Sequence, residues 1–295
     1  MNSLPPRHLV IFGCGYVGTA VATEALQRGW RVVALTRNET TATVLRAAGI
    51  EVVVADLATD AWHGAISSEA AVVLNCVSSG GQGLESYRRS YVEGMGSILA
   101  WTQKSGPVDT LVYTSSTSVY PQDAGATVEE GAATHGASER ADLLLEAEAR
   151  LQKSFPVSCA RWFILRLAGI YGPGRHHLID QVRSGEVAGL GGHHLNLIHR
   201  DDIVTAIWAL FSAARECRNE IFNVVDDEPA LKADVVAWLS NRLGLPLPRF
   251  TGQPAGGRRA VTPDRLISNR KLKNLPGWHL SYPTFRDGYE KMLSR

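Results

Sequence analysis

The segment HLVIFGCGYVG, residues 8–18, constrains the fold more than any other stretch of this chain. An apolar run ends at Gly13, and Gly15 and Gly18 follow as residues 17–28 begin to carry apolar groups at helical spacing. A G-x-G-x-x-G pattern between a strand and a helix makes a tight turn, lets a diphosphate approach the backbone, and allows close helix–strand packing. The N–H groups and positive dipole end of the helix complete a phosphate site. The segment predicts dinucleotide binding; a turn that serves only packing is the alternative.

Strand-like and helix-like segments alternate through the first half of the chain. The predicted strands are 8–13, 31–37, 50–56, 70–77 and 108–116, and the predicted helices are 17–28, 40–48 and 84–104. Repeated β-α-β units at this spacing form a parallel sheet that helices cover on both faces. The sequence therefore predicts an α/β fold with a Rossmann-type, doubly wound parallel sheet.

The second half is less regular. It contains predicted helices at 137–153, 201–213 and 230–243, strands at 157–167 and 221–225, a loop at 169–177, and a basic Pro/Gly-rich stretch at 245–263. We expect an NAD(P)-binding Rossmann domain over residues 1–167. A smaller substrate lobe, residues 168–295, would be interleaved with the sheet within a single chain unit.

The composition excludes several classes of protein. The 295 residues are 45% hydrophobic and 20% charged, an ordinary globular balance, and the formal net charge is +1. No global attraction to nucleic acid or to a membrane surface is expected. No apolar run reaches about 18 residues, and the N-terminus lacks the apolar core of a signal peptide. The four cysteines lack metal-ligand spacing, which indicates free thiols in a reducing, cytoplasmic compartment.

The end of the second predicted strand determines the choice of cofactor. An acidic residue there would bind the ribose 2′-hydroxyl of NAD. This chain has Thr36, Arg37 and Asn38 instead. A guanidinium group can neutralise a 2′-phosphate, so the sequence predicts NADP rather than NAD, unless Arg37 is merely a solvated residue. Asp56 and Leu57, after the third strand, would contact the adenine. The predicted cofactor residues are Gly13, Gly15, Tyr16, Val17, Gly18, Thr36, Arg37, Asp56, Leu57, Cys76 and Val77.

Several motifs occur in order along nearly the whole chain. They are GCGYVG at 13–18, YTSSTSVYP at 113–121, ILRLAGIYGPGR at 164–175, LNLIHRDDIVTAI at 195–207, IFNVVDDEP at 221–229, and ISNRKLKNLPGWHLSYPTFRDGYE at 267–290. Together they resemble an extended, or atypical, short-chain dehydrogenase/reductase of the NAD-dependent epimerase/dehydratase family.

The resemblance implies roles for individual residues. Ser116 would hydrogen-bond a substrate oxygen, although backbone capping at a strand end is its structural alternative. Leu167 and Ile170 would contact the nicotinamide. Arg175 and Arg259 would bind the diphosphate of a nucleotide-sugar, with solubilising surface charge as the alternative. The substrate would be a small molecule; the oligomeric state stays open, and a homodimer is compatible with the sequence.

The family's usual Tyr-x-x-x-Lys pair is replaced. The stretch HGASE, residues 135–139, puts His135 in the tyrosine position and Glu139 in the lysine position. On a helix this spacing places both side chains on one face. An imidazole with a carboxylate one turn away can transfer protons, but two solvated residues in a first helical turn are the alternative. Arg140 would supply a cation if the register shifted, and Tyr120 is the other phenol near Ser116.

Two classes of function remain open. An NADP-dependent oxidoreductase, epimerase or dehydratase would act on a sugar-like carbonyl or alcohol with Ser116 and either Tyr120 or His135. A sensor or regulatory protein would keep the dinucleotide site without turnover. A metal site is not expected, because neither His176–His177 nor His193–His194 has ligand spacing or a completing carboxylate or cysteine.

Overall fold

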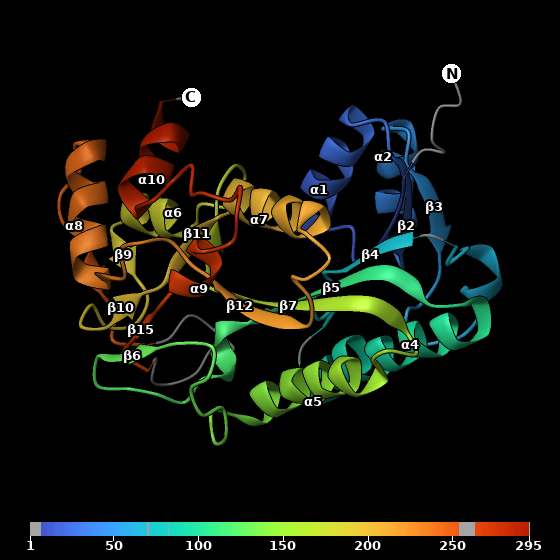
Figure 1. The fold of residues 1–295 in the computed structure, drawn as a ribbon. Coiled ribbons are helices and arrows are strands. Elements are labelled where there is room, and N and C mark those ends of the chain that lie inside the picture. The colour runs from blue at the N-terminus through green and yellow to red at the C-terminus, as the bar shows by residue number, and fades with distance from the viewer. Residues whose placement is uncertain (1–6, 70, 82, 254–262, 295) are drawn as a thin grey trace. The chain divides into compact units, whose positions relative to one another are not determined.

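The computed structural model describes residues 7–69, 71–81, 83–253 and 263–294. Its main sheet has seven strands in the order β12-β7-β5-β4-β1-β2-β3. The neighbouring pairs β3–β2, β2–β1, β1–β4 and β4–β5 are all parallel. Helices flank this sheet in Figure 1. The prediction of an α/β fold with a Rossmann-type, doubly wound parallel sheet is confirmed.

The observed elements follow the predicted segments closely. The strands of the main sheet are β1 (His8–Phe12), β2 (Arg31–Thr36), β3 (Glu51–Val54), β4 (Ala71–Asn75), β5 (Val108–Ser116), β7 (Cys159–Leu167) and β12 (Glu220–Val224). The accompanying helices are α1 (Tyr16–Gln27), α2 (Glu39–Ala47), α3 (Leu84–Tyr87), α4 (Gly94–Ser105), α5 (Glu139–Ser154) and α7 (Arg200–Ser212), with short 3-10 helices η1 (His63–Ala65) and η3 (Thr117–Val119).

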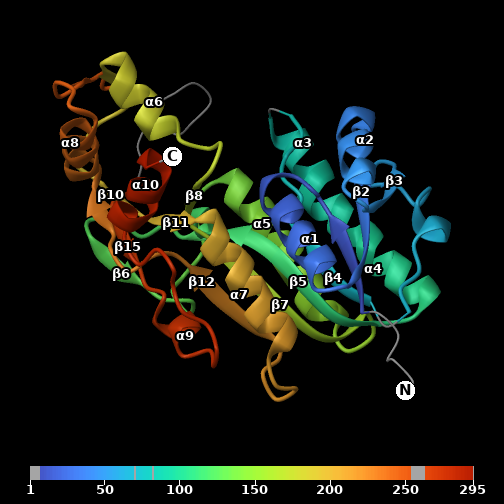
Figure 2. The ribbon, with the colours of Figure 1, turned by 90° about the horizontal axis from the view of Figure 1, so that it is seen from above.

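The predicted helix at 84–104 has an internal irregularity. A π-helix, η2 (Arg88–Glu93), joins α3 to α4. Single π turns inside helices occur often at functional sites, because they redirect side chains. Figures 1 and 2 show α4 and α5 along one face of the sheet and α1 and α7 on the other.

Contact clustering divides the chain into two compact units. Unit 1 comprises residues 1–119, 138–166 and 204–222; unit 2 comprises 120–137, 167–203 and 223–295. Within unit 2 lie helices α6 (His177–Ser184), α8 (Lys232–Leu243), α9 (Arg270–Lys273) and α10 (Phe285–Leu293) and strands β6 (Ala126–Val128), β8 (Gly169–Tyr171), β9 (Glu186–Val187), β10 (His194–Leu195), β11 (Leu197–His199), β13 (Ala230–Leu231), β14 (Arg249–Phe250) and β15 (Arg265–Ile267). The prediction of a simple loop at 169–177 is wrong, since β8 pairs with β11 there.

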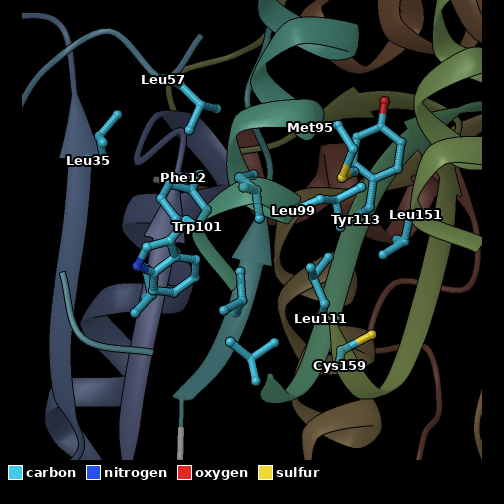
Figure 3. Packing of buried hydrophobic residues seen from close by; sticks show 14 of the residues in the cluster. Phe12, Leu35, Leu57, Met95, Leu99, Trp101, Leu111, Tyr113, Leu151 and Cys159 are labelled. Carbon is cyan, nitrogen blue, oxygen red and sulfur yellow. The ribbon is translucent and has the colours of Figure 1, made fainter. Parts of the chain in front are cut away.

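An aromatic cluster fills the core of unit 1. The ring of Phe12, in β1, lies 4.9 Å from Trp62 and 5.7 Å from Trp101 between ring centroids. Each indole also donates a hydrogen bond, Trp62 to the carbonyl of Leu57 and Trp101 to that of Ile66. Figure 3 shows Phe12 and Trp101 packed together. Rings of this size bury much apolar area, and their satisfied N–H groups make that burial possible.

No helix in the described part of the chain is long and apolar enough to cross a membrane.

A buried carboxyl group distinguishes the core of unit 2. Asp226 is 1% exposed, its Oδ1 atom accepts a hydrogen bond from Glu228 N, and its Oδ2 atom has no partner among the described residues. Burial, the largest cause, raises the pKa of Asp226 to about 8; the charges of Glu228, Asp227 and Asp202 also raise it, and the hydrogen bond from Glu228 N opposes them. The folded protein therefore favours the protonated acid.

The pKa of Asp226 predicts a pH-dependent stability. A carboxyl group with a raised folded-state pKa contributes fully to stability below its unfolded pKa, and the contribution disappears as pH rises towards 8. Asp226→Asn, a neutral isostere, should raise the melting temperature by roughly 2–8 °C at pH 8.5 and by less at pH 5. Thermal unfolding at both pH values measures this difference. The exposed Asp234→Asn is the control; an equal shift at both pH values in Asp226→Asn would contradict the assignment.

Candidate dinucleotide and active site

The turn after β1 is closed by contacts that only glycine permits. Gly13 has φ +88°, and a Cβ there would lie 2.5 Å from the backbone of Val77, which follows β4. A Cβ on Gly18, in α1, would lie 2.7 Å from the carbonyl oxygen of Gly13 and 3.0 Å from Cys76 Sγ. Desolvation raises the pKa of the Cys76 thiol, which donates to the Gly13 carbonyl at 3.1 Å. Two of the three glycines are therefore required by the protein's own packing.

Gly15 differs from the other two glycines. It is exposed, its φ is −98°, and a Cβ on it would meet no atom within 4 Å. Neither a left-handed backbone nor a neighbouring protein atom requires glycine here. The open space lies at the N-cap of α1, whose first turn holds no acidic residue and whose N-cap makes no side-chain hydrogen bond. This arrangement suits an anionic ligand that approaches the backbone closely.

The two α1 residues predicted for the cofactor site have different surroundings. Tyr16 begins α1 and is half-buried, whereas Val17 is buried and packs into the core of unit 1. The side chain of Val17 is therefore directed to protein packing, and only its backbone could face a ligand at the turn.

The ends of β2 and β3 place Arg37 beside Asp56. Thr36 pairs with Val54 in the parallel register, and Ala55 N donates to Thr36 O at 3.0 Å. The side-chain oxygen of Asn38 caps α2 by accepting a hydrogen bond from Thr41 N at 3.0 Å. Arg37, which is exposed, is the first charged side chain after β2. Buried Leu57 follows Asp56.

Asp56 is held in its charged form by its neighbours. Burial by itself would raise the pKa of Asp56, but hydrogen bonds from Ala58 N and Arg89 and the charges of Arg89 and Arg37 outweigh it, and the pKa lies below its usual value. Arg89 Nε and Nη2 both donate to Asp56 Oδ2, at 3.0 and 2.8 Å. Arg89 lies in η2 and was not predicted from the sequence, because no local pattern connects it to a residue 33 positions away.

A buried ionic network supports the end of β5. Ser115 Oγ donates to Glu148 Oε1 at 2.6 Å, and Arg166 donates to both Glu148 oxygens at 3.1 and 2.7 Å. Glu148 and Arg166 are 3% and 4% exposed. The next residue, half-buried Ser116, accepts from Ser118 N at 3.1 Å. Ser115, Glu148 and Arg166 therefore fix the strand end that presents Ser116.

The geometry corrects one premise about His135 and Glu139. Helix α5 begins at Glu139, with Ser138 as an N-cap that accepts from Ala141 N at 3.2 Å. His135 lies in an exposed turn next to Gly136, whose φ is +85°. The spacing of His135 and Glu139 had suggested that they share one helix face; they do not, because His135 lies before the helix begins. Glu139 is exposed in the first helical turn, where the helix dipole stabilises a carboxylate.

The hydroxyl of Tyr120 makes a buried hydrogen bond within unit 2. This residue is fully buried in unit 2, and its hydroxyl donates to Asn223 Oδ1 at 2.8 Å. The backbone carbonyl of Tyr120 in turn accepts from Arg265 at 2.7 Å. These contacts favour the structural alternative for Tyr120 over a role in proton transfer.

The remaining predicted residues lie in unit 2 or outside the described residues. Leu167 ends β7 and is buried, Ile170 pairs with Ile198 between β8 and β11, and Arg175 is exposed in the turn that follows. Arg259 lies outside the described residues. His194 Nδ1 contacts Asp264 Oδ1 at 2.7 Å. Within the described ranges, no group of three or more His, Cys, Asp or Glu side chains could hold a metal ion.

Comparison with known families decides the relationship. The model of the NAD dependent epimerase/dehydratase family matches residues 9–224. The chain belongs to this family. Over 283 residues, this epimerase/dehydratase-family chain is 27% identical to Protein YeeZ of Escherichia coli (strain K12), covering 94% of this chain and 97% of that protein.

Two further relatives define how far the likeness reaches. A 3-diazoavenalumate denitrifying reductase of Streptomyces sp is 28% identical over 159 residues, 49% of this chain and 51% of that protein. The solved structure of UDP-glucose 4-epimerase from Thermotoga maritima matches with a TM-score of 0.83 at 16% identity, over 97% of both chains. At that identity the likeness shows the fold alone, including the parallel sheet.

The contrast between Gly13 and Gly15 generates a prediction. Gly15→Ala should leave the melting temperature nearly unchanged, because its Cβ meets no protein atom, yet weaken NADPH or NADH binding about tenfold or more. Gly13→Ala should destabilise the fold by about 2 kcal/mol or more, through the positive φ and the overlap with Val77. Thermal unfolding and calorimetric titration separate the two effects. Unaltered nucleotide affinity in a folded Gly15→Ala protein would count against a phosphate at this turn.

Proposed function

We propose that this chain binds NADP(H) at the turn after β1 and uses it as an oxidoreductase or epimerase/dehydratase on a sugar-like small molecule. The observation that carries the proposal is the open space above Gly15 at the start of α1. A carboxylate at the end of β2 would favour NAD, and Arg37 stands there instead. The family assignment supports a nicotinamide dinucleotide as the ligand.

The residues present fit such a cofactor. The backbone at Gly13 and Gly15 and the N-terminus of α1 would hold the diphosphate, and Arg37 the 2′-phosphate. Asp56 and Leu57 would border the adenosine. When bound, a nicotinamide cofactor accepts or donates a hydride. Ser116, held by the strand end that Glu148 and Arg166 brace, would donate a hydrogen bond to a substrate carbonyl or alcohol oxygen and orient it.

Reductase chemistry has independent support from one relative. The Streptomyces protein that matches about half of this chain is named as a reductase. A nucleotide-sugar substrate has weaker support, since it rests on the family resemblance and on basic residues such as Arg175. We therefore propose a carbonyl or alcohol of a sugar-like substrate, with a nucleotide-sugar as one member of that class.

A second candidate function is an NADP(H)-binding sensor without turnover. The position of His135 favours it, because this side chain lies in an exposed turn outside α5 and Glu139, not a lysine, stands four residues after it. The burial of Tyr120 and its hydrogen bond to Asn223 likewise favour a structural role for this phenol over proton transfer. The cofactor site is common to both candidates, so turnover alone distinguishes them.

The cofactor preference is tested at Arg37. Arg37→Ala should weaken NADP binding about ten- to hundredfold, the range for a lost charge-assisted hydrogen bond, and change NAD binding far less. Arg31→Ala is a matched control, because Arg31 is exposed at the opposite end of β2 and pairs with Glu51. Calorimetric titration with both nucleotides measures the effect. Tighter binding of NAD than of NADP by the unaltered protein would refute the preference.

Turnover is tested at His135. With NADPH and a panel of sugar-derived aldehydes and ketones, a general acid at His135 predicts that His135→Ala lowers kcat roughly hundredfold while the Kd for NADPH stays the same, because a general acid acts only on the reaction step. His279→Ala, also exposed, is the control. Turnover that survives in His135→Ala removes this residue from the chemistry. NADPH binding with no turnover on any substrate would favour the sensor.

A further inference from the structure

Arg37 and Asp56 form a mixed-charge edge beside the glycine turn. They follow adjacent parallel strands, β2 and β3, and the charge of Arg37 contributes to the lowered pKa of Asp56. A free carboxylate at this place would repel a 2′-phosphate and offset the positive charge of Arg37 that would attract it. Selectivity for NADP through Arg37 is therefore favoured when the charge of Asp56 is neutralised.

Arg89 supplies that neutralisation. Two of its nitrogens donate to one oxygen of Asp56, and Ala58 N donates to the other at 3.0 Å. The third guanidinium nitrogen of Arg89 lies 3.6 Å from Glu93 Oε2. Arg89 thus contacts carboxylates of both Asp56 and Glu93. Its positive charge offsets the negative charge of Asp56, and Arg37 is a second cation near Asp56. The π-helix η2, which includes Arg89, places its side chain against the end of β3.

The guanidinium of Arg37 lies where a side chain at position 80 would begin. The sheet order puts β1, with its glycine turn, between β2 and β4. Arg37 follows β2, yet its side chain reaches the segment after β4: a Cβ on Gly80 would lie 1.6 Å from Arg37 Nη2 and 2.7 Å from its Cζ. The backbone of Gly80 is not in the left-handed region, so what a Cβ here would displace is the far end of the flexible Arg37 side chain.

We infer that Arg89 and Gly80 are specificity-determining residues for the 2′-phosphate: Arg89 masks the carboxylate of Asp56, and Gly80 seats the guanidinium of Arg37 across the glycine turn. Both are positioning residues, and the inference rests on the proposed binding of NADP(H). It adds two segments, η2 and the residues after β4, to a preference that the sequence placed on Arg37 alone.

A double-mutant cycle tests the masking. The readout is the ratio of the Kd for NAD to the Kd for NADP, measured by calorimetry at low ionic strength, where surface charges are least screened. Arg89→Ala should lower this ratio roughly three- to tenfold, because it exposes the charge of Asp56. Adding Asp56→Asn should restore the ratio to within about twofold. Arg88→Ala, which removes the neighbouring exposed arginine paired with Glu146, should leave the ratio unchanged.

A single substitution tests the contact between Gly80 and the guanidinium of Arg37. Gly80→Ala should lower the same ratio roughly three- to tenfold with little change in melting temperature, since the displaced atoms are the far end of a flexible side chain. Gly64→Ala is the control, because a Cβ there meets no atom within 4 Å.

The outcomes separate this inference from the proposed function. If Arg37→Ala weakens NADP binding but Arg89→Ala and Gly80→Ala leave the ratio unchanged, the inference is overturned and the proposed function stands. If Asp56→Asn fails to restore the ratio in the Arg89→Ala background, masking is wrong. If the unaltered protein binds neither nucleotide, the proposed function is wrong, and the inference that rests on it is overturned as well.

Discussion

The close approach between the turn after β1 and the end of β4 is the contact on which the rest of the site depends. Gly13 leaves no room for a side chain against Val77, and Gly18 brings α1 against the Gly13 carbonyl. The thiol of Cys76 donates to that same carbonyl. These contacts hold the N-terminus of α1 at the carboxyl edge of the sheet, with Gly15 facing open space. The positive end of the helix dipole is then directed at whatever enters that space.

The strand order converts distant residues into neighbours at this edge. Because β2 and β4 flank β1, the guanidinium of Arg37 can reach the backbone of Gly80, 43 positions along the chain. In the same way, Asp56 after β3 meets Arg89 from η2. Charge at the site is therefore a property of three segments together. A single arginine after β2 would have a different effect if the neighbouring carboxylate were unpaired.

The regular elements could be predicted because their signals are local. Largely apolar runs of five to eleven residues marked the strands, and helical spacing marked α1, α2, α5, α7 and α8. The start of α5 was placed too early, although Gly136 followed by Ser138 is a readable helix-start signal. The Ser115–Glu148–Arg166 network, the Arg89–Asp56 pair and the seat at Gly80 could not be predicted, since each joins residues from separate elements. The roles of Ser116, His135 and Glu139 stay predictions.

The sequence by itself determined the α/β class, the strand–turn–helix unit at 8–18 and the family, since periodicity, glycine spacing and ordered motifs are properties of the chain read in one direction. Only the tertiary structure decided that Gly15 faces open space while neighbouring atoms leave no room for a side chain at Gly13 or Gly18. It also decided that Tyr120 is buried and that Arg89 donates hydrogen bonds to Asp56. The physical reason is that side-chain packing and Coulomb interactions depend on distance in space, and the sheet order brings together residues that the sequence keeps apart.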